Sequence, residues 1–182
     1  TWENGNRFPT LAFGNYVNRQ AWAATHTAFG VDDQNRKSGL NTCLDNYLLR
    51  PAGLPAQRFA APITLTPGFC ALSILFSDWD RSGRRDLRIS NDQYYYLPPG
   101  EEQLWHLAPE PTLYSPEEGW QKVNIWGMGI ASHDVTGDGY PDYFLTNMMA
   151  NKLVTLGDNP SAGPRYVDMA GPAGVMAPHP YA

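Results

Sequence analysis

Three aspartates crowd into one short stretch in the second half of the chain. The stretch HDVTGDGYPDYFLTN, residues 133–147, holds them within nine positions, together with a threonine and two glycines. Calcium takes about six to eight oxygen ligands, and a tight loop can supply them from alternate side chains and a backbone carbonyl. The spacing predicts a calcium loop over residues 134–142, the second loop. Its predicted ligands are Asp134, Thr136, Asp138, the carbonyl of Tyr140, and Asp142.

The same pattern occurs 56 residues earlier, where SDWDRSGRRDLRISND aligns with HDVTGDGYPDYFLTNM. Residues 78–86 are the first loop, and an Asn follows each loop at the same distance, Asn91 and Asn147. A serine replaces one carboxylate and three arginines add positive charge, so we expect weaker calcium binding here. The predicted ligands of the first loop are Asp78, Asp80, Ser82, the carbonyl of Arg84, and Asp86.

A third, degenerate copy of the repeat opens the chain. In WENGNRFPTLAFGN, Thr10 aligns with Asp142 and Asn15 with Asn147, while Trp2 stands where the other copies have their first Asp. We expect this copy to keep the fold and to have lost the ion, which leaves two calcium sites.

Two other interpretations of the loops compete with calcium binding. An EF-hand needs a Glu at loop position 12 and flanking helices. Leu145 and Ile89 occupy that position here, and the flanks are strand-like, which excludes the EF-hand. The other interpretation is a plain Asp/Gly hairpin turn, in which Asp caps its own backbone. The in-register repetition favours calcium over the plain turn.

The elements that must position these loops are strands. Short apolar runs separated by turn residues cover 71–76, 86–90, 123–130 and 142–146, and no helical period of useful length occurs. With 42% hydrophobic and 17% charged residues, the chain can form a core. We predict an all-β protein of antiparallel sheets.

Composition excludes some classes of function. The net charge of −5 and scattered Lys and Arg argue against a nucleic-acid partner, and no apolar run is long enough for a transmembrane segment. Cys43 and Cys70 form a disulfide in an oxidising compartment or are two buried thiols, and spacing leaves both open.

The paired DxDxSGxxD and DxTxDGxxD loops resemble the FG-GAP or VCBS repeats of integrin-type β-propellers. More narrowly, residues 65–181 resemble secreted bacterial VCBS-repeat proteins related to cartilage acidic protein, the ASPIC/UnbV group. The resemblance implies an extracellular or periplasmic, calcium-binding propeller with ions in loops between the outer strands of each blade. It also implies a binding or structural role rather than catalysis.

The expected architecture is a β-propeller segment of about three blades that forms part of a longer chain, because 182 residues are too few for a closed ring. We therefore expect a protein partner or other chains to complete or abut it. The predicted divisions are a degenerate repeat (1–17), a long insertion (18–50), and repeats over 51–115 and 116–182.

Two further functions remain as alternatives. A propeller-type lyase or hydrolase would need converging carboxylates or a His–carboxylate pair, but the histidines are scattered and the acidic pairs 101–102 and 117–118 are expected to be solvated. Carbohydrate could stack on exposed aromatics, although core packing is the expected role of Trp79 and Trp126. The remaining aromatic candidates are Tyr94, Tyr95, Tyr96, Trp105 and Trp120.

Overall fold

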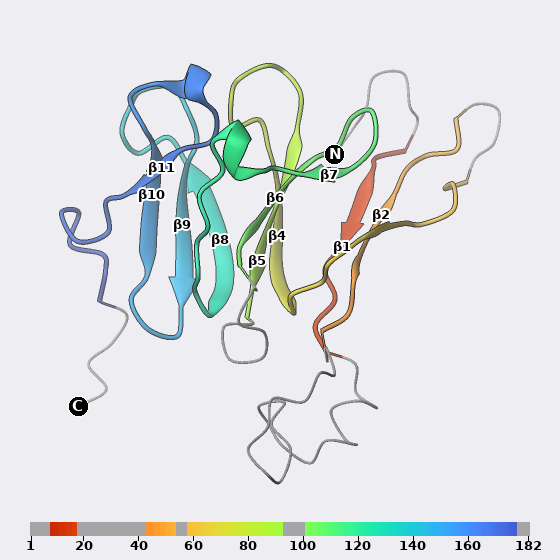
Figure 1. Ribbon diagram of the computed structural model, residues 1–182, viewed down its shortest axis with the longest axis horizontal. Coiled ribbons are helices and arrows are strands. Elements are labelled where there is room, and N and C mark those ends of the chain that lie inside the picture. The colour runs from red at the N-terminus through yellow and green to blue at the C-terminus, as the bar shows by residue number, and fades with distance from the viewer. Residues whose placement is uncertain (1–7, 18–42, 54–57, 93–100, 178–182) are drawn as a thin grey trace, which may run out of the picture.

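The structure, a computed structural model, describes residues 8–17, 43–53, 58–92 and 101–177 (Figure 1). Within these ranges the chain is all-β, as predicted, with three antiparallel sheets and two short 3-10 helices. The predicted Trp2, most of the predicted insertion, and Tyr94 to Tyr96 lie outside the described residues.

Each sheet is built from strands that follow one another in the chain. Sheet I contains β1 (Leu11–Phe13), β2 (Asn46–Leu49) and β3 (Ile63–Leu65). Sheet II contains β4 (Ala71–Ser77), β5 (Asp86–Asn91), β6 (Gln103–His106) and β7 (Thr112–Leu113). Sheet III contains β8 (Gly127–His133), β9 (Asp142–Asn147), β10 (Lys152–Leu156) and β11 (Tyr166–Asp168). The helices are η1 (Pro116–Glu118) and η2 (Pro160–Ala162).

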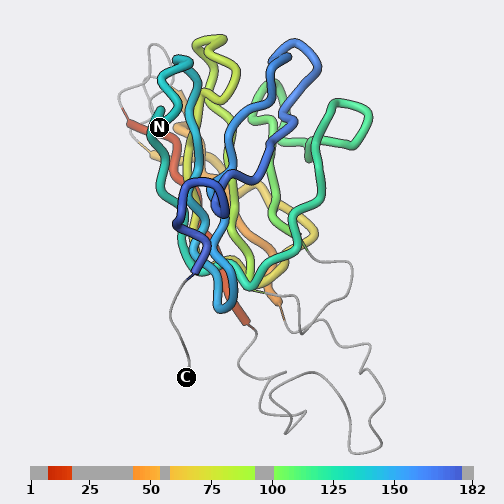
Figure 2. Tube along the Cα trace, turned by 90° about the vertical axis from the view of Figure 1, so that its left-hand side faces the viewer, coloured from red at the N-terminus to blue at the C-terminus, as the bar shows by residue number. Residues whose placement is uncertain are grey.

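The three sheets stand next to one another, with their strand axes roughly aligned (Figures 1 and 2). The first strands of sheets II and III, β4 and β8, pack against each other, and the Ile130 N–H donates to Ser73 Oγ at 3.3 Å between them. The described strands form no closed ring, so the propeller remains a proposal.

Sheets II and III repeat each other in their first hairpin. β4 and β8 begin at residues 71 and 127, β5 and β9 begin at 86 and 142, and both pairs differ by 56. Their registers also shift at the same place, between Ala71 and Ser73 and between Gly127 and Gly129. The repeat found in the sequence is therefore a repeat of local geometry, including its β-bulge.

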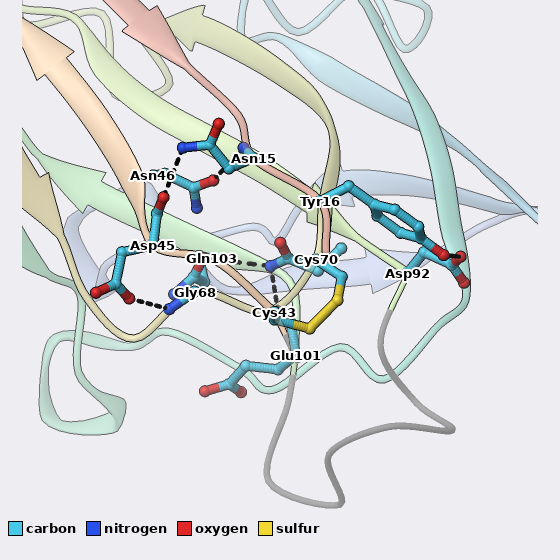
Figure 3. Close-up of a disulfide and its surroundings, with 11 residues drawn as sticks. Asn15, Tyr16, Cys43, Asp45, Asn46, Gly68, Cys70, Asp92, Glu101 and Gln103 are labelled. Carbon is cyan, nitrogen blue, oxygen red and sulfur yellow. Dashed lines mark hydrogen bonds between the residues drawn. A yellow bond between two sulfur atoms is a disulfide. The ribbon is translucent and has the colours of Figure 1, made fainter. Parts of the chain in front are cut away.

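In all three sheets, an Asn after or at the end of one strand bonds to residues at the start of the following strand, across the connection between them. We call this arrangement the Asn clamp. The Asn N–H donates to a side-chain oxygen at the start of the following strand, at 2.8, 3.0 and 3.1 Å in sheets I to III. The Asn side-chain amide donates to the backbone carbonyl of the residue just before that side-chain acceptor, at 2.7, 2.7 and 2.8 Å. The clamps are Asn15 with Asn46 and Asp45 (Figure 3), Asn91 with Glu102 and Glu101, and Asn147 with Asn151 and Ala150.

The clamp in sheet I identifies β1 as the counterpart of β5 and β9. In the described part of the first copy, Asn15 thus takes the position that its alignment with Asn147 predicts. The predicted divisions differ from the sheets in two places: β2 lies inside the predicted insertion 18–50, and β3 lies inside the predicted repeat 51–115 but pairs with β2. Because strand pairing is a long-range property, the spacing of apolar runs could not reveal it.

Two apolar clusters hold the sheets together. Sheet II lies between them, and its strand β5 alternates, with Leu87 and Ile89 facing sheet I and Arg88 facing sheet III. The cluster between sheets I and II contains Leu48, Leu65, Ala71, Leu87, Ile89, Trp105 and Leu107. The cluster between sheets II and III contains Trp79, Leu104, Tyr114, Trp120, Ile125, Tyr143, Leu145, Val154 and Leu156.

Cys43 and Cys70 form a disulfide, which resolves the choice that the sequence left open. The two Cα atoms are 4.7 Å apart, and the cysteines precede β2 and β4. The bond therefore joins sheet I to sheet II close to the Asn15 clamp (Figure 3).

Candidate metal-binding loops

The two predicted calcium loops lie at the same end of neighbouring sheets, the upper end in Figure 1. The first loop joins β4 to β5 and the second joins β8 to β9. The resemblance implied loops between outer strands, but each loop follows the first strand of its sheet, and these first strands contact each other. The loops are consequently neighbours.

In the second loop, carboxylates accept hydrogen bonds from backbone N–H groups of the loop. Asp134 accepts through Oδ1 from the N–H of Gly137 at 2.7 Å and through Oδ2 from that of Gly139 at 2.9 Å. Asp138 Oδ1 accepts from the N–H of Tyr140 at 2.7 Å. These bonds satisfy donors that a tight turn leaves unpaired.

Asp142 is the most buried of the predicted ligands, with 1% of its surface exposed. Its Oδ2 accepts from the N–H groups of Val135 and Thr136 at 2.8 and 3.0 Å and from Thr136 Oγ1 at 3.1 Å. Its Oδ1 is buried and has no hydrogen-bond partner. A buried carboxylate oxygen without a donor is costly, and a cation would satisfy it.

The first loop reproduces part of this arrangement. Asp78 Oδ2 accepts from the N–H of Gly83 at 3.0 Å, the same bond that Asp134 makes with Gly139. Asp78 Oδ1 is also buried and without a partner. The side chains of Asp80 and Ser82 accept from N–H groups two residues further on, at 3.0 and 3.3 Å.

The last aspartate of the first loop has different partners. Asp86 Oδ2 accepts from Trp79 Nε1 at 2.9 Å and from the Tyr114 hydroxyl at 2.6 Å. Burial raises the pKa of Asp86 above its usual range, while these two bonds act in the opposite direction. The pKa of Tyr114 is raised by its burial and by its bond to Asp86. Asp86 is thus bonded to the core, whereas Asp142 is bonded to its own loop.

A small cavity of about 30 Å³ lies beside the first loop. Its walls combine predicted ligands with side chains from the end of β6 and from the residue after β7. The lining residues include Asp80, Ser82, Asp86, His106 and Tyr114.

The described parts of the chain contain no group of three His, Cys, Asp or Glu side chains that could hold a metal ion by themselves. The loop carboxylates accept backbone N–H groups instead, as the plain-turn interpretation expects. An ion in either loop would also need hydroxyl and carbonyl ligands, which the predicted donor sets contain. The two buried, unpartnered oxygens of Asp78 and Asp142 are compatible with such an ion.

One His–carboxylate pair does form, at the surface. His106 Nε2 lies 2.7 Å from Glu118 Oε1, with side-chain exposures of 31% and 44%, and the His106 ring stacks on Tyr114 at 3.6 Å. The pair borders the first loop. Among the other predicted residues, His133 is exposed at the end of β8, and His26 and His179 lie outside the described residues.

Glu102 is a correction to the expectation that residues 101–102 are solvated. It is 1% exposed, and its Oε1 accepts from Ser90 Oγ at 2.9 Å and from the Asn91 N–H at 3.0 Å. Burial raises the pKa of Glu102 to about 7, with Arg88 opposing the shift. A Cβ at Gly127 would stand 2.8 Å from Glu102 Oε1, so sheet III approaches the carboxylate through a glycine. No local sequence pattern marks Glu102, because its burial depends on donors from β5 and on Gly127 of sheet III.

Arg88 also escaped prediction. It is fully buried, and its guanidinium carbon lies 4.4 Å from the ring centroid of Tyr143, 5.0 Å from Tyr166 and 5.4 Å from Trp120. The arginine therefore joins sheets II and III by cation–π contacts. Trp79, Trp105 and Trp120 are buried in the clusters, consistent with core packing rather than sugar stacking.

Comparisons with known proteins return no relative. No protein-family model matches the chain, and searches of curated proteins and of solved structures find no match. In the described residues, no helix is long and apolar enough to cross a membrane.

Proposed function

We propose that the protein is a calcium-stabilised interaction or structural module, a propeller segment rather than a catalyst. The observation that carries the proposal is Asp142, a buried carboxylate at the mouth of the second loop with one oxygen unpartnered. The repeat supports the proposal, because the first loop also has a buried, unpartnered carboxylate oxygen, on Asp78.

Side chains and carbonyls of the two loops would hold the ions. In the second loop they are Asp134, Thr136, Asp138, Tyr140 and Asp142; in the first they are Asp78, Asp80, Ser82, Arg84 and Asp86. Bound calcium would neutralise carboxylates and tie the two ends of each hairpin together, so ion binding would stabilise the fold.

Exposed apolar side chains on the two outermost sheet faces support a protein partner. Leu48 faces sheet II, so its neighbour Tyr47 and the paired Phe13 face away from it, with 39% and 46% of their surface exposed. On sheet III, Val167 is 52% exposed. We propose that sheets of another chain cover these faces, in the way that sheets I and III cover sheet II.

The disulfide supports an exported location, extracellular or periplasmic, because such bonds persist in oxidising compartments. The same bond would hold sheets I and II together outside the cell.

Thermal unfolding with calcium titrated against a chelator tests the proposal. We expect calcium to raise the melting temperature, magnesium to do so much less, and Asp142→Asn to reduce the calcium effect while keeping the shape of the side chain. Asp138→Ala is expected to abolish the second site. An unchanged calcium stoichiometry in Asp138→Ala, or no calcium effect on the wild type, would refute the assignment.

A further inference from the structure

Arg81 of the first loop reaches across to the second loop. Its guanidinium carbon lies 5.7 Å from the ring centroid of Tyr140, in cation–π range. Its Nη1 lies 2.6 Å from the position that a Cβ on Gly139 would occupy. The guanidinium therefore fills the space that Gly139 leaves beside its backbone.

The direction of this side chain depends on the shape of the first loop. Arg81 has a φ of 58°, the left-handed conformation that few residues other than glycine adopt. Its N–H donates to the carbonyl of Asp78 at 3.3 Å. Arg81 also stands between Asp80 and Ser82, two predicted ligands, so an ion bound there would fix its backbone.

The segment that Arg81 contacts is central to the second loop. The N–H of Gly139 donates to Asp134 and the N–H of Tyr140 donates to Asp138. The Tyr140 carbonyl is itself a predicted ligand. In the described parts of the chain, Arg81 makes no ion pair with a carboxylate, so the contact with Gly139 and Tyr140 is its main interaction.

We propose that Arg81 is a positioning residue that couples the two loops. Calcium in the first loop fixes Arg81, Arg81 holds Gly139 and Tyr140 in place, and the second loop then binds calcium more tightly. By linkage, calcium in the second loop strengthens binding in the first by the same factor. The inference rests on the proposed function and names a regulation of the same sites.

Calorimetric calcium titrations of the full chain test the coupling. Arg81→Gly removes the side chain and still permits a positive φ, so the first loop keeps its backbone. We expect Arg81→Gly to weaken calcium binding at the second loop by about 3- to 10-fold, within the range of such couplings. Arg85→Ala, which removes another exposed arginine of the same loop that is not a predicted ligand, is the matched control and should leave the second loop at wild-type affinity.

Two further variants separate coupling from a local effect. Asp80→Ala, which disables the first loop, should weaken the second loop about as much as Arg81→Gly does, and the double variant should be no weaker. Tyr140→Leu removes the ring from the other side, keeps the carbonyl, and should reproduce the loss.

The inference is overturned if Arg81→Gly and Arg85→Ala bind calcium alike at the second loop. It is also overturned if Asp80→Ala leaves the second loop unchanged, because Arg81 would then act without an ion in the first loop. Two ions that bind independently would refute the coupling and leave the proposed function standing. Absence of any calcium binding would overturn both.

Discussion

Sheets II and III share one backbone frame and differ in the partners of their equivalent carboxylates. The strand ends, the bulge and the bond from the first Asp to the sixth-position glycine are the same in both. Asp86, however, bonds to Trp79 and Tyr114, whereas Asp142 bonds to its own loop. At the other end, sheet II uses a buried Glu102 in its clamp and sheet III uses Asn151.

The difference shows that the backbone geometry of a hairpin and the hydrogen-bond partners of its carboxylates are determined by different residues. Strand register and the clamp place a loop, and they tolerate different side chains at the same position. Under the proposed function, calcium binding requires a ninth loop residue that is free to coordinate the ion. The weaker binding expected at the first loop thus has a second cause besides Ser82, since the core competes for Asp86.

The largest expected contrast is between the two ninth-position aspartates. Asp142→Ala leaves the N–H groups of Val135 and Thr136 without their acceptor, and we expect it to lower the free energy of unfolding by about 2–4 kcal/mol. Asp86→Ala should cost about 1–2 kcal/mol, because Trp79 Nε1 also bonds to Tyr114. Urea denaturation in the presence of a chelator measures both. Equal losses would contradict the assigned difference between the sheets.

Glu102→Gln gives the clamp of sheet II a neutral amide, as in sheet III. The pKa of Glu102 is raised from its usual 4.5 to about 7, so its contribution to stability is full below pH 4.5 and is lost as pH rises through 7. We expect the free energy of unfolding of the wild type to fall by up to about 3 kcal/mol across this window, and the variant to lack this decline. Denaturant unfolding from pH 4 to 8 tests it.

Glu117→Gln, on the exposed face of η1, is the control for the pH series and should keep the wild-type slope. A Glu102→Gln profile parallel to that of the wild type would show that folding does not raise the pKa of Glu102.

Ser82→Asp makes the first loop more like the second. The added carboxylate should raise the calcium affinity of the first loop about 10-fold, because affinity follows the number of charged ligands. Ser82→Asn has the same size without the charge and should change the affinity little. Calcium titration in the Asp138→Ala background isolates the first loop, and equal affinities of the two variants would count against ion binding there.

The smallest expected effect comes from Tyr114→Phe, which removes one bond to Asp86. It should lower the free energy of unfolding by about 1 kcal/mol in chelator and raise the calcium affinity of the first loop about 2- to 3-fold. Tyr16→Phe removes a similar bond, to Asp92 at 2.8 Å, and is the control that should leave calcium affinity unchanged. A loss of affinity in Tyr114→Phe would show that Tyr114 supports the site.

The sequence predicted the all-β class and the two repeated hairpins because these depend on local patterns. The runs 71–76, 86–90 and 142–146 fall within one residue of β4, β5 and β9, and Asn91 and Asn147 make equivalent bonds, as their alignment in the repeat predicts. In the loops, the aligned Asp78 and Asp134 make equivalent bonds. Calcium binding itself stays a prediction.

What the sequence did not predict depends on contacts between distant segments. Burial of Glu102 requires donors from β5 and the close approach of Gly127 from sheet III. The bond from Tyr114 to Asp86 joins residues 28 apart, and the contact between Arg81 and Tyr140 joins two repeats. The sequence predicts an insertion where β2 lies, because the partners of β2, β1 and β3, lie on the far sides of long connections.

The Asn clamp makes the protein tolerant of insertions at one defined point. Its backbone bond spans 4 residues in sheet III, 11 in sheet II and 31 in sheet I, with nearly the same length each time. Loop closure costs grow only with the logarithm of loop length, so the step from 4 to 31 residues costs about 2 kcal/mol. A foreign peptide placed between Asn147 and Asn151 should therefore be displayed without disturbing sheet III, which makes this hairpin a grafting site.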